Sequence, residues 1–590
     1  MPTGGGKSLC YQLPALLREG LAVVVSPLVA LMKDQVDGLQ ALGVPTTYVN
    51  SLLEPAEIGK RQAAVARGEV KLLYVAPERL MTPGFLQLLA TQPISYFAID
   101  EAHCISEWGH DFRPAYLELR RLRDLFPTTT LGAFTATATR QVQADIVAHL
   151  GLQDAASFRG SYNRPNLFYE VRPKQNTYAQ LVRYLRGRRG ASGIVYCQSR
   201  DGTEQLAAKL CADGFSAGAY HAGLEAEERR RRQDAFIRDD LHIMVATIAF
   251  GMGIDKPDVR FVVHYDLPKN LEGYYQESGR AGRDGEPSDC ILFYSYGDVV
   301  KQLRFVEEKP TAIEREVARD KLRQMANWAS SLTCRRRSLL AYFDERFEGQ
   351  TSPCCDICRL GPREVDCTIP AQMYLSCVKR TGQRYGSAHI IQVLRGSRGE
   401  RVLRAGHDRV STFGIGRGRS HAEWQHLAQE LVRGGYARVS EDGFGIVRVT
   451  ERGDAVLFRG ERVVLDLPAT LFAPDDGEAH RTSAVKVGMA RRPAARPSAP
   501  AAAPPAGAAE PTSYQLLFEE LRALRKRLAD ERGVPPYVIF HDTTLWQMAR
   551  QRPTSRAEML SLRGVGERKA IEFGDAFIAC LDEYRRREEA

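Results

Sequence analysis

The sequence predicts an α/β protein with two tandem parallel-sheet domains, followed by smaller helical and cysteine-rich parts. Short apolar runs rich in β-branched residues alternate with helix-length segments, and each run ends in polar or small residues. This alternation stops near residue 150 and then begins again. Apolar runs separated by helices are typical of buried parallel strands. The restart therefore indicates two such domains with a cleft between them.

The strands of both domains are predicted by their apolar runs. The first domain contains LAVVVSPL (21–28), VKLLYVAPE (70–78), ISYFAIDEAH (94–103) and TTLGAFTAT (129–137). The second contains GIVYCQS (193–199), FSAGAYHAG (215–223), IMVATIAF (243–250), VRFVVHYD (259–266) and DCILFYS (289–295). An Ala/Pro-rich stretch before residue 512 cannot bury a core and predicts a linker. The expected parts are 1–155, 156–300, a helical cysteine-rich part at 301–362, a further domain at 363–470, the linker at 471–512 and a helical tail at 513–590.

The composition of the chain excludes some classes of protein and favours others. No apolar run among the 590 residues approaches the ~18 needed to span a membrane, and the N-terminus has no signal pattern, so we expect a cytosolic protein. The net charge of +9 is unevenly spread, because residues 379–438 hold 12 basic and 4 acidic side chains. This basic segment favours a polyanionic partner, with a solubilising surface as the alternative.

The glycine-rich start, TGGGKS, predicts a phosphate site. Glycines let backbone N–H groups surround phosphate oxygens, while Lys7 would reach the β- and γ-phosphates and Ser8 would ligate Mg²⁺. A helical pattern follows, and a helix N-terminus favours anions. Met1 stands where the full motif has its first glycine, so a chance glycine-rich turn is the alternative. The expected ATP-binding loop is Thr3, Gly4, Gly5, Gly6, Lys7 and Ser8.

Two further groups complete a predicted catalytic site. Asp100 and Glu101 follow an apolar strand, at the edge where α/β proteins bind ligands. Asp100 would hold Mg²⁺, and Glu101 would orient and deprotonate the attacking water. In QESGRAGRDG, Arg280 and Arg283 are three residues apart and are expected on one face of a helical turn. Guanidinium groups from across the cleft suit the charge that develops on a γ-phosphate.

Taken together, the motifs resemble the RecQ family of superfamily 2 DNA helicases. They are TGGGKS, SPLVALMKDQ, APERL, DEAH, FTATAT, VYCQSR, ATIAFGMGIDKPDVR and QESGRAGRDG, in this order. The resemblance implies two RecA-like P-loop domains, a zinc-binding helical subdomain, a winged helix and a helical C-terminal domain. It also implies ATP-dependent 3′-to-5′ DNA unwinding in repair and recombination, with ATP, Mg²⁺ and Zn²⁺. Expected partners are single-stranded and partly duplex DNA, with single-stranded DNA-binding or repair proteins, near the nucleoid of a bacterial-type cytosol.

The resemblance assigns further residues to nucleotide and DNA. Gly251, Asp255 and Gln276 would belong to the ATP site, and Thr247 would touch the DNA backbone. An aromatic-rich loop after DEAH is similar to one that senses single-stranded DNA in the family. Physically, aromatic rings stack on bases while a guanidinium meets phosphate, although Phe112 could instead pack in the core. The expected DNA contacts of this loop are Trp108, His110, Phe112 and Arg113.

Four clustered cysteines resemble the zinc-binding region of the family. Cys334, Cys354, Cys355 and Cys358 would form a closed tetrahedral Cys₄ site. Cys354 stands beside Cys355, where the family usually has two intervening residues, and we expect both to bind zinc only with a strained backbone. Cys367 is a substitute ligand, and a metal-free or disulfide form is the alternative.

The C-terminal parts resemble a winged-helix domain and the helicase-and-RNase D C-terminal domain. Arg417, Arg419 and Ser420 would hold phosphates near a helix N-terminus. Trp424 and Leu427, by contrast, are expected in the core. In the tail, Arg568 and Lys569 follow a glycine turn that would clamp a DNA backbone, with a solvated helix end as an equal alternative. Trp546 of the same domain is expected in the core.

Relatives carry a strand and an adenine-contacting motif before the phosphate loop, and neither is present here. We expect that strand to be central in the first sheet, so its loss would leave unpaired groups costing ~1–3 kcal/mol each. This predicts an unstable or remodelled first domain, and a start site placed too far downstream as the cause. The alternatives to a DNA helicase are a non-catalytic DNA-binding remnant and an RNA helicase, because DEAH also occurs in the latter.

Overall fold

The computed structural model forms two compact units, each described here by itself. The first comprises Met1–Ala329, Arg336–Gln350 and Ala506–Ala590, and the second Ser330–Arg335 and Thr351–Pro505. None of the helices in the described part of the chain is both long and apolar enough to cross a bilayer. The described residues are 1–2, 4–27, 29–50, 53–109, 111–250, 256–331, 333–349, 353–360, 362–440, 445–468 and 513–589.

A parallel five-stranded sheet organises the N-terminal lobe. Its order is β2-β3-β1-β4-β5, and the apolar runs predicted from the sequence supply β1, β3, β4 and β5. The strands are β1 (Leu21–Val25), β2 (Thr46–Val49), β3 (Leu72–Val75), β4 (Ile94–Ile99) and β5 (Thr130–Ala133). The helices are α1 (Lys7–Leu17), α2 (Val29–Ala41), α3 (Pro55–Ala66), α4 (Pro77–Leu80), α5 (Pro83–Ala90), α6 (Arg121–Leu125) and α7 (Arg140–Leu150), with 3₁₀ turns η1 (Ala102–Ile105) and η2 (Pro114–Arg120).

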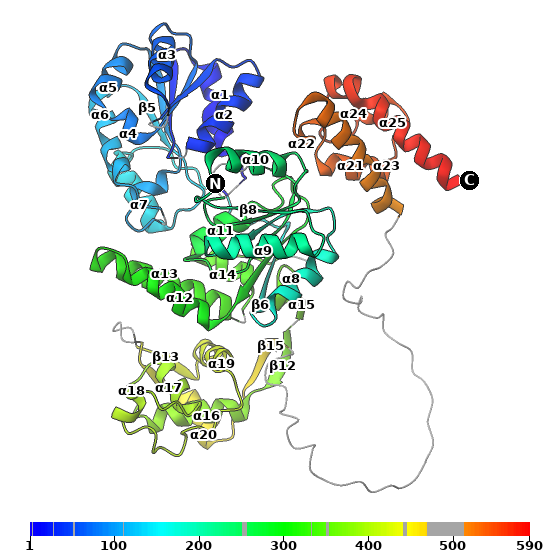
Figure 1. The fold of residues 1–590 in the computed structure, drawn as a ribbon. Coiled ribbons are helices and arrows are strands. Elements are labelled where there is room, and N and C mark those ends of the chain that lie inside the picture. The colour runs from blue at the N-terminus through cyan, green and yellow to red at the C-terminus, as the bar shows by residue number, and fades with distance from the viewer. Residues whose placement is uncertain are drawn as a thin grey trace. The chain divides into compact units, whose positions relative to one another are not determined.

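Helices cover both faces of this sheet, which is why its strands read as uninterrupted apolar runs. Ala22 and Val24 of β1 pack with α1 and α2, whereas Val23 and Val25 pack in the core cluster that holds residues of α3, α5 and α7. Figure 1 shows these helices, in blue and light blue, around the sheet. Every residue of β1 is buried, and at the end of the strand the Val25 carbonyl accepts from the Asp100 backbone N–H at 2.8 Å.

The expectation of a gap in the middle of the first sheet is wrong. The described strands are consecutive neighbours, and β1 pairs with both β3 and β4. β5 pairs with β4 alone, so the open position lies at an edge of the described sheet. Backbone groups at the edge of a sheet can be satisfied by water, unlike groups that are buried in its middle.

A six-stranded parallel sheet forms the second lobe, in the order β6-β11-β10-β7-β9-β8. The edge strand β6 was not predicted. Its sequence LFYEVRP mixes charged with apolar residues, and only part of it is buried. Its strands are β6 (Leu167–Pro173), β7 (Ser192–Tyr196), β8 (Ala217–Tyr220), β9 (Ile243–Ala246), β10 (Val259–His264) and β11 (Ser288–Tyr294). Its helices are α8 (Thr177–Arg186), α9 (Arg200–Ala212), α10 (Ala226–Ile237) and α11 (Leu271–Ser278), and α12 (Tyr296–Glu307), α13 (Ala312–Ser330) and α14 (Arg335–Tyr342) follow.

The second unit holds a small helical core with two short antiparallel sheets, each of two strands. Trp424 and Leu427 are fully buried in it, as predicted, and the Trp424 indole N–H donates to the Gly416 carbonyl at 2.9 Å. Its elements are α15 (Asp356–Leu360), β12 (Pro362–Asp366), α16 (Thr368–Arg380), α17 (Ser387–Leu394), α18 (Glu400–Arg404), α19 (His421–Arg433), β13 (Ala437–Val439), β14 (Val447–Val449), α20 (Glu451–Phe458) and β15 (Val464–Pro468).

The C-terminal domain is all helical, as its periodicity predicts. It contains α21 (Ser513–Arg532), α22 (Pro536–Ile539), α23 (Asp542–Gln551), α24 (Arg556–Leu560) and α25 (Glu567–Glu589). Trp546 packs partly buried against this core and stacks on Phe518 at 4.1 Å between ring centroids. The predicted linker, 471–512, lies outside the described residues.

Candidate active site and metal centre

The glycine-rich loop leads directly into a helix. Gly4 and Gly6 have φ angles of +76° and +78°, a region that side chains disfavour, and α1 begins at Lys7. The start of α1 therefore faces the loop, and a helix N-terminus favours an anion. Lys7 reaches the end of β4 and donates to Glu101 at 2.9 Å.

Asp100 lies at the same edge and is linked to Ser8 by a tyrosine. The Tyr11 hydroxyl lies 3.2 Å from the Ser8 hydroxyl and 3.4 Å from an Asp100 carboxylate oxygen. Burial, together with the neighbouring Glu101 carboxylate, raises the pKa of Asp100 to about 6 against the opposing effect of Lys7. Hydroxyl and carboxylate oxygens are ligands that Mg²⁺ prefers, and a cation here would offset the penalty of the buried carboxylate. Ser8 and Asp100 therefore fit the predicted Mg²⁺ ligands.

Glu101 is held as a carboxylate by two neighbours. It adopts a left-handed backbone conformation, with φ +47°, immediately after Asp100. Burial alone would raise the pKa of Glu101, but the charges of Lys7 and His103 lower it well below its usual value. Glu101 is therefore held in its charged form at the end of β4, beside Lys7.

One ring nitrogen of His103, Nδ1, lies between this carboxylate and the FTATAT segment. His103 lies 3.3 Å from Glu101 and 2.9 Å from the Thr135 hydroxyl. Thr135 in turn accepts from the Thr137 backbone N–H at 3.2 Å. The sequence assigned no role to His103 or Tyr11. The spacing of His103 from Glu101 in DEAH was the available signal, whereas no motif indicated Tyr11.

The second lobe brings arginines to this loop from a turn, and not from one helical face as predicted. α11 ends at Ser278, and glycines at 279 and 282 interrupt helical continuation. Arg164 holds the turn by donating to the Gly279, Ala281 and Gly282 carbonyls at 2.8–3.0 Å. Arg280 and Arg283 therefore lie on a turn after α11 and not on one face of a helix.

Arg283 lies against the phosphate loop itself. A Cβ on Gly4 would lie 3.1 Å from the Arg283 side chain, so these two predicted residues of different lobes are in direct contact range. Arg280 is nearly buried and lines a cavity of about 380 Å³ with Glu101, His103 and Gln276. The structure thus brings Lys7, Asp100, Glu101, Arg280, Arg283 and Gln276 to one cleft.

The aromatic loop after DEAH packs tightly on that motif. A Cβ on Gly109 would lie 2.4 Å from the His103 carbonyl oxygen, so only glycine fits. Trp108 is 49% exposed, and its carbonyl accepts from Lys321 at 2.5 Å. Phe112 is half-buried, and Arg113 pairs with Asp111 at 3.2 Å and donates to the Pro27 carbonyl at 3.0 Å. The loop therefore packs directly on the backbone of His103.

The remaining predicted contact residues lie on several surfaces. Thr247 directly follows strand β9 of the second lobe, and its backbone N–H donates to the Tyr220 carbonyl at 3.1 Å. Arg417 is exposed, Arg419 lies 3.9 Å from Glu423, and Ser420 caps α19 in a capping box with Glu423.

In the C-terminal helical domain, Arg568 is exposed, whereas Lys569 donates to the Val538 carbonyl at 2.7 Å. Thr3, His110, Gly251 and Asp255 lie outside the described residues.

The four clustered cysteines come together as a metal-ligand set. The Sγ atoms of Cys334, Cys354, Cys355 and Cys358 all lie within 4.8 Å of one another. Separations of 3.5, 3.8 and 4.0 Å among them match the ~3.8 Å expected between sulfurs of a tetrahedral site with Zn–S bonds of ~2.3 Å. These residues fit a structural zinc ion. Arg335 and Asp356 pair at 3.1 Å beside them and join the two chain segments.

The structure does not bear out the disulfide alternative or Cys367 as a substitute ligand. All twelve are free thiols, and Cys367 is buried in the core of the second unit, at the N-terminus of α16. Neither Cys354 nor Cys355 has a positive φ angle, so the strain expected for adjacent ligands is not present in this form. Close approach of thiolates, with burial, raises the pKa of Cys358 to about 12, which a bound cation would reverse.

Replacing Cys334 with Ser is expected to remove the zinc. The substitution removes one of four thiolate ligands, and the melting temperature should fall by about 10 °C, since ligation energy contributes directly to folding. Zinc content per chain and thermal unfolding measure both effects. Cys367→Ser is the matched control and should keep one zinc; equal zinc loss in both variants would contradict this ligand set.

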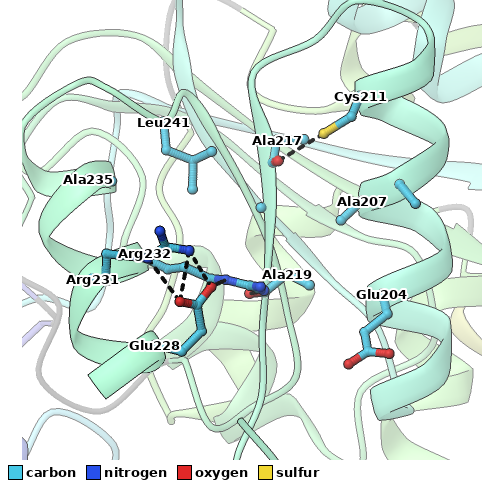
Figure 2. A pocket seen from close by; sticks show the side chains of 12 residues that line it. Glu204, Ala207, Cys211, Ala217, Ala219, Glu228, Arg231, Arg232, Ala235 and Leu241 are labelled. Atoms are coloured by element: carbon cyan, nitrogen blue, oxygen red, sulfur yellow. Dashed lines mark hydrogen bonds and ion pairs between the residues drawn. The ribbon is translucent and has the colours of Figure 1, made fainter. Parts of the chain in front are cut away.

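A second hollow, on the second lobe, is not part of the site. It has a volume of about 490 Å³ and lies over β8 between α9 and α10. Figure 2 shows Arg231 and Arg232 turned to Glu228 and Cys211 turned to the Ala217 carbonyl. Its lining includes none of the residues predicted for nucleotide or DNA.

A phosphate-binding loop on one parallel sheet, faced by arginines from a second, defines a two-lobed NTP-driven motor of the helicase class. Family models match in series along the chain: DEAD/DEAH box helicase at 1–145, helicase conserved C-terminal domain at 176–285, RecQ zinc-binding at 296–359, RQC domain at 361–471 and HRDC domain at 515–581.

Full-length relatives agree with this series. The chain is 41% identical to the ATP-dependent DNA helicase RecQ of Haemophilus influenzae, over 99% of this chain and 90% of the relative. It is 42% identical to that of Pasteurella multocida, over 99% and 89%, and 38% identical to that of Bacillus subtilis, over 99% and 93%. The chain belongs to the RecQ family of ATP-dependent DNA helicases.

Proposed function

We propose that this chain unwinds partly duplex DNA in the 3′-to-5′ direction by hydrolysing ATP in the cleft between its two lobes. The observation that carries the proposal is the meeting of Lys7 and Glu101 with Arg283 of the other lobe around one loop. Binding of a triphosphate at that loop would draw the lobes together, and release of phosphate would separate them. Alternate closing and opening would move the lobes along a single strand.

In the proposed reaction, Lys7 leaves Glu101 and binds the β- and γ-phosphates. Glu101 then accepts a proton from water as the water oxygen bonds to the γ-phosphorus and the bond to the β–γ bridging oxygen breaks. Arg283 and Arg280 stabilise the charge on the γ-phosphoryl oxygens. Mg²⁺, held by Ser8 and Asp100, would neutralise phosphate charge. The products are ADP and phosphate, and Glu101 returns its proton to solvent.

DNA contacts would surround the motor. Trp108 and Phe112 would stack on bases, and the fit of Gly109 against His103 would pass that contact to the catalytic carboxylate. Arg417, Arg419 and Arg568 would hold phosphates without reading sequence, which makes binding salt-sensitive. We assign the chain to DNA repair or recombination beside the nucleoid of a bacterial-type cytosol.

Strand displacement tests the proposal. Duplexes with either a 3′ or a 5′ single-stranded tail are mixed with the full chain, Mg²⁺ and ATP, or a non-hydrolysable ATP analogue as the control. We expect displacement from the 3′-tailed duplex with ATP alone. Preference for the 5′ tail would contradict the polarity, and stimulation of hydrolysis by RNA instead of DNA would contradict the substrate.

A further inference from the structure

The C-terminal helical domain contacts the second lobe through one face of α21. Arg522 donates to the Gly190 carbonyl at 2.5 Å. Lys526 donates to the Asp240 carboxylate at 2.7 Å and to the Arg238 carbonyl at 3.0 Å. Successive turns of one helix thus meet the same end of the lobe, near α10 and the segment that follows it.

A buried ionic cluster lies at the centre of this contact. Arg525 is fully buried and bonds Asp542 of its own domain at 2.8 Å. On the lobe side it lies 3.7 Å from Asp258 and 4.0 Å from Asp239, two carboxylates that share Lys256 at 2.9 and 2.6 Å. A buried charge that loses its partners is strongly destabilising, so the tail and the lobe have complementary surfaces.

The ionic cluster continues into the turn that carries Arg283. Arg260 lies 3.9 Å from Asp542 and also pairs with Asp284, the residue that follows Arg283. The Asp284 backbone N–H donates to the Pro257 carbonyl at 3.3 Å, and the Gly282 N–H donates to Val259 at 2.8 Å. The segment 256–260 therefore touches the tail on one side and the arginine turn on the other.

We propose that the docked C-terminal domain positions Arg283 for ATP hydrolysis, with Arg525 and Asp542 as positioning residues that act through Arg260 and Asp284. Docking fixes the 256–260 segment, which fixes the turn at 282–284 and holds Arg283 against the phosphate loop. Undocking lets that turn relax, and stabilisation of the transition state is lost while ATP still binds. This rests on the proposed role of Arg283.

The test reverses two charges on the docking face of the full chain, in Arg522→Glu/Lys526→Glu. Both new carboxylates face Asp239, Asp240 and Asp258, so the tail should undock, and hydrogen exchange at 256–260 and 282–286 should increase. We expect kcat for DNA-stimulated ATP hydrolysis to fall about fivefold or more, with KM for ATP changed less than about twofold. The control, Arg527→Glu/Arg586→Glu, makes the same change of charge at exposed positions of this domain and should behave as the wild type.

A second measurement separates positioning from general damage. In an Arg283→Ala background the same double reversal should lower kcat no further, because both changes remove one interaction. An equal fall in that background, an undocked variant with wild-type kcat, or unchanged exchange protection would each overturn the inference. A wild-type chain without DNA-stimulated hydrolysis would instead overturn the proposed function, so the two failures are distinguishable.

Discussion

Lys7→Ala is expected to lower DNA-stimulated ATP hydrolysis by about 10²- to 10³-fold, as loss of a preorganised charged donor does in other active sites. Lys7 is the cation nearest to both Glu101 and Asp100, and its ammonium lies 2.9 Å from Glu101. Its removal deprives the phosphates of a positive charge and leaves two buried carboxylates uncompensated. Steady-state phosphate release, with and without single-stranded DNA, measures the effect.

Two controls make the Lys7 result decisive. Lys60→Ala removes an exposed lysine of α3 and should leave turnover unchanged. Thermal unfolding of Lys7→Ala shows whether the first lobe remains folded, because breaking a buried pair can cost about 3–5 kcal/mol. If a folded Lys7→Ala chain hydrolyses ATP as the wild type does, the motor is not used and the protein is a DNA-binding remnant.

Arg283→Ala is expected to lower kcat by about 10³-fold or more, the effect that arginines from across a cleft have on phosphoryl transfer. Arg283 contacts the phosphate loop from the other lobe, so it serves the transition state more than ground-state binding. The affinity for a fluorescent ATP analogue should therefore change little, while single-turnover hydrolysis slows.

Replacing Arg283 with lysine tests whether the shape of the guanidinium group matters as well as its charge. Arg283→Lys should recover little activity, because an ammonium cannot reproduce the planar, two-pronged contact of guanidinium with phosphoryl oxygens. Arg183→Ala, at an exposed position of α8 in the same lobe, is the matched control. A large loss of ATP affinity in Arg283→Ala, with kcat unchanged, would contradict a role in the transition state.

Much of the site could be predicted from short, contiguous motifs. TGGGKS and DEAH each carry their chemistry within a few residues, and each follows or precedes an element that periodicity predicts. The cysteines were predicted in the same way, although the geometry of adjacent Cys354 and Cys355 was misjudged. Distances among their Sγ atoms depend on α14 and α15, which the spacing alone does not fix.

Other features could not be predicted because they depend on partners distant in the sequence. Tyr11 gains its role only from the approach of Ser8 and Asp100, and Arg164 from carbonyls more than a hundred residues away. Strand β6 was missed because an edge strand carries a mixed pattern. The order of strands placed the open position at the edge beside β5, which corrected the expected central gap.

The sequence by itself determined the family, the two parallel-sheet lobes and the candidate phosphate-binding residues, because these follow from local periodicity and contiguous motifs. Only the tertiary structure decided that Arg283 lies against the phosphate loop, that His103 lies between Glu101 and Thr135, and that Arg525 is buried against the second lobe. The physical reason is that ion pairs and close packing act over a few ångströms in space, whereas the groups concerned are separated by tens to hundreds of residues along the chain.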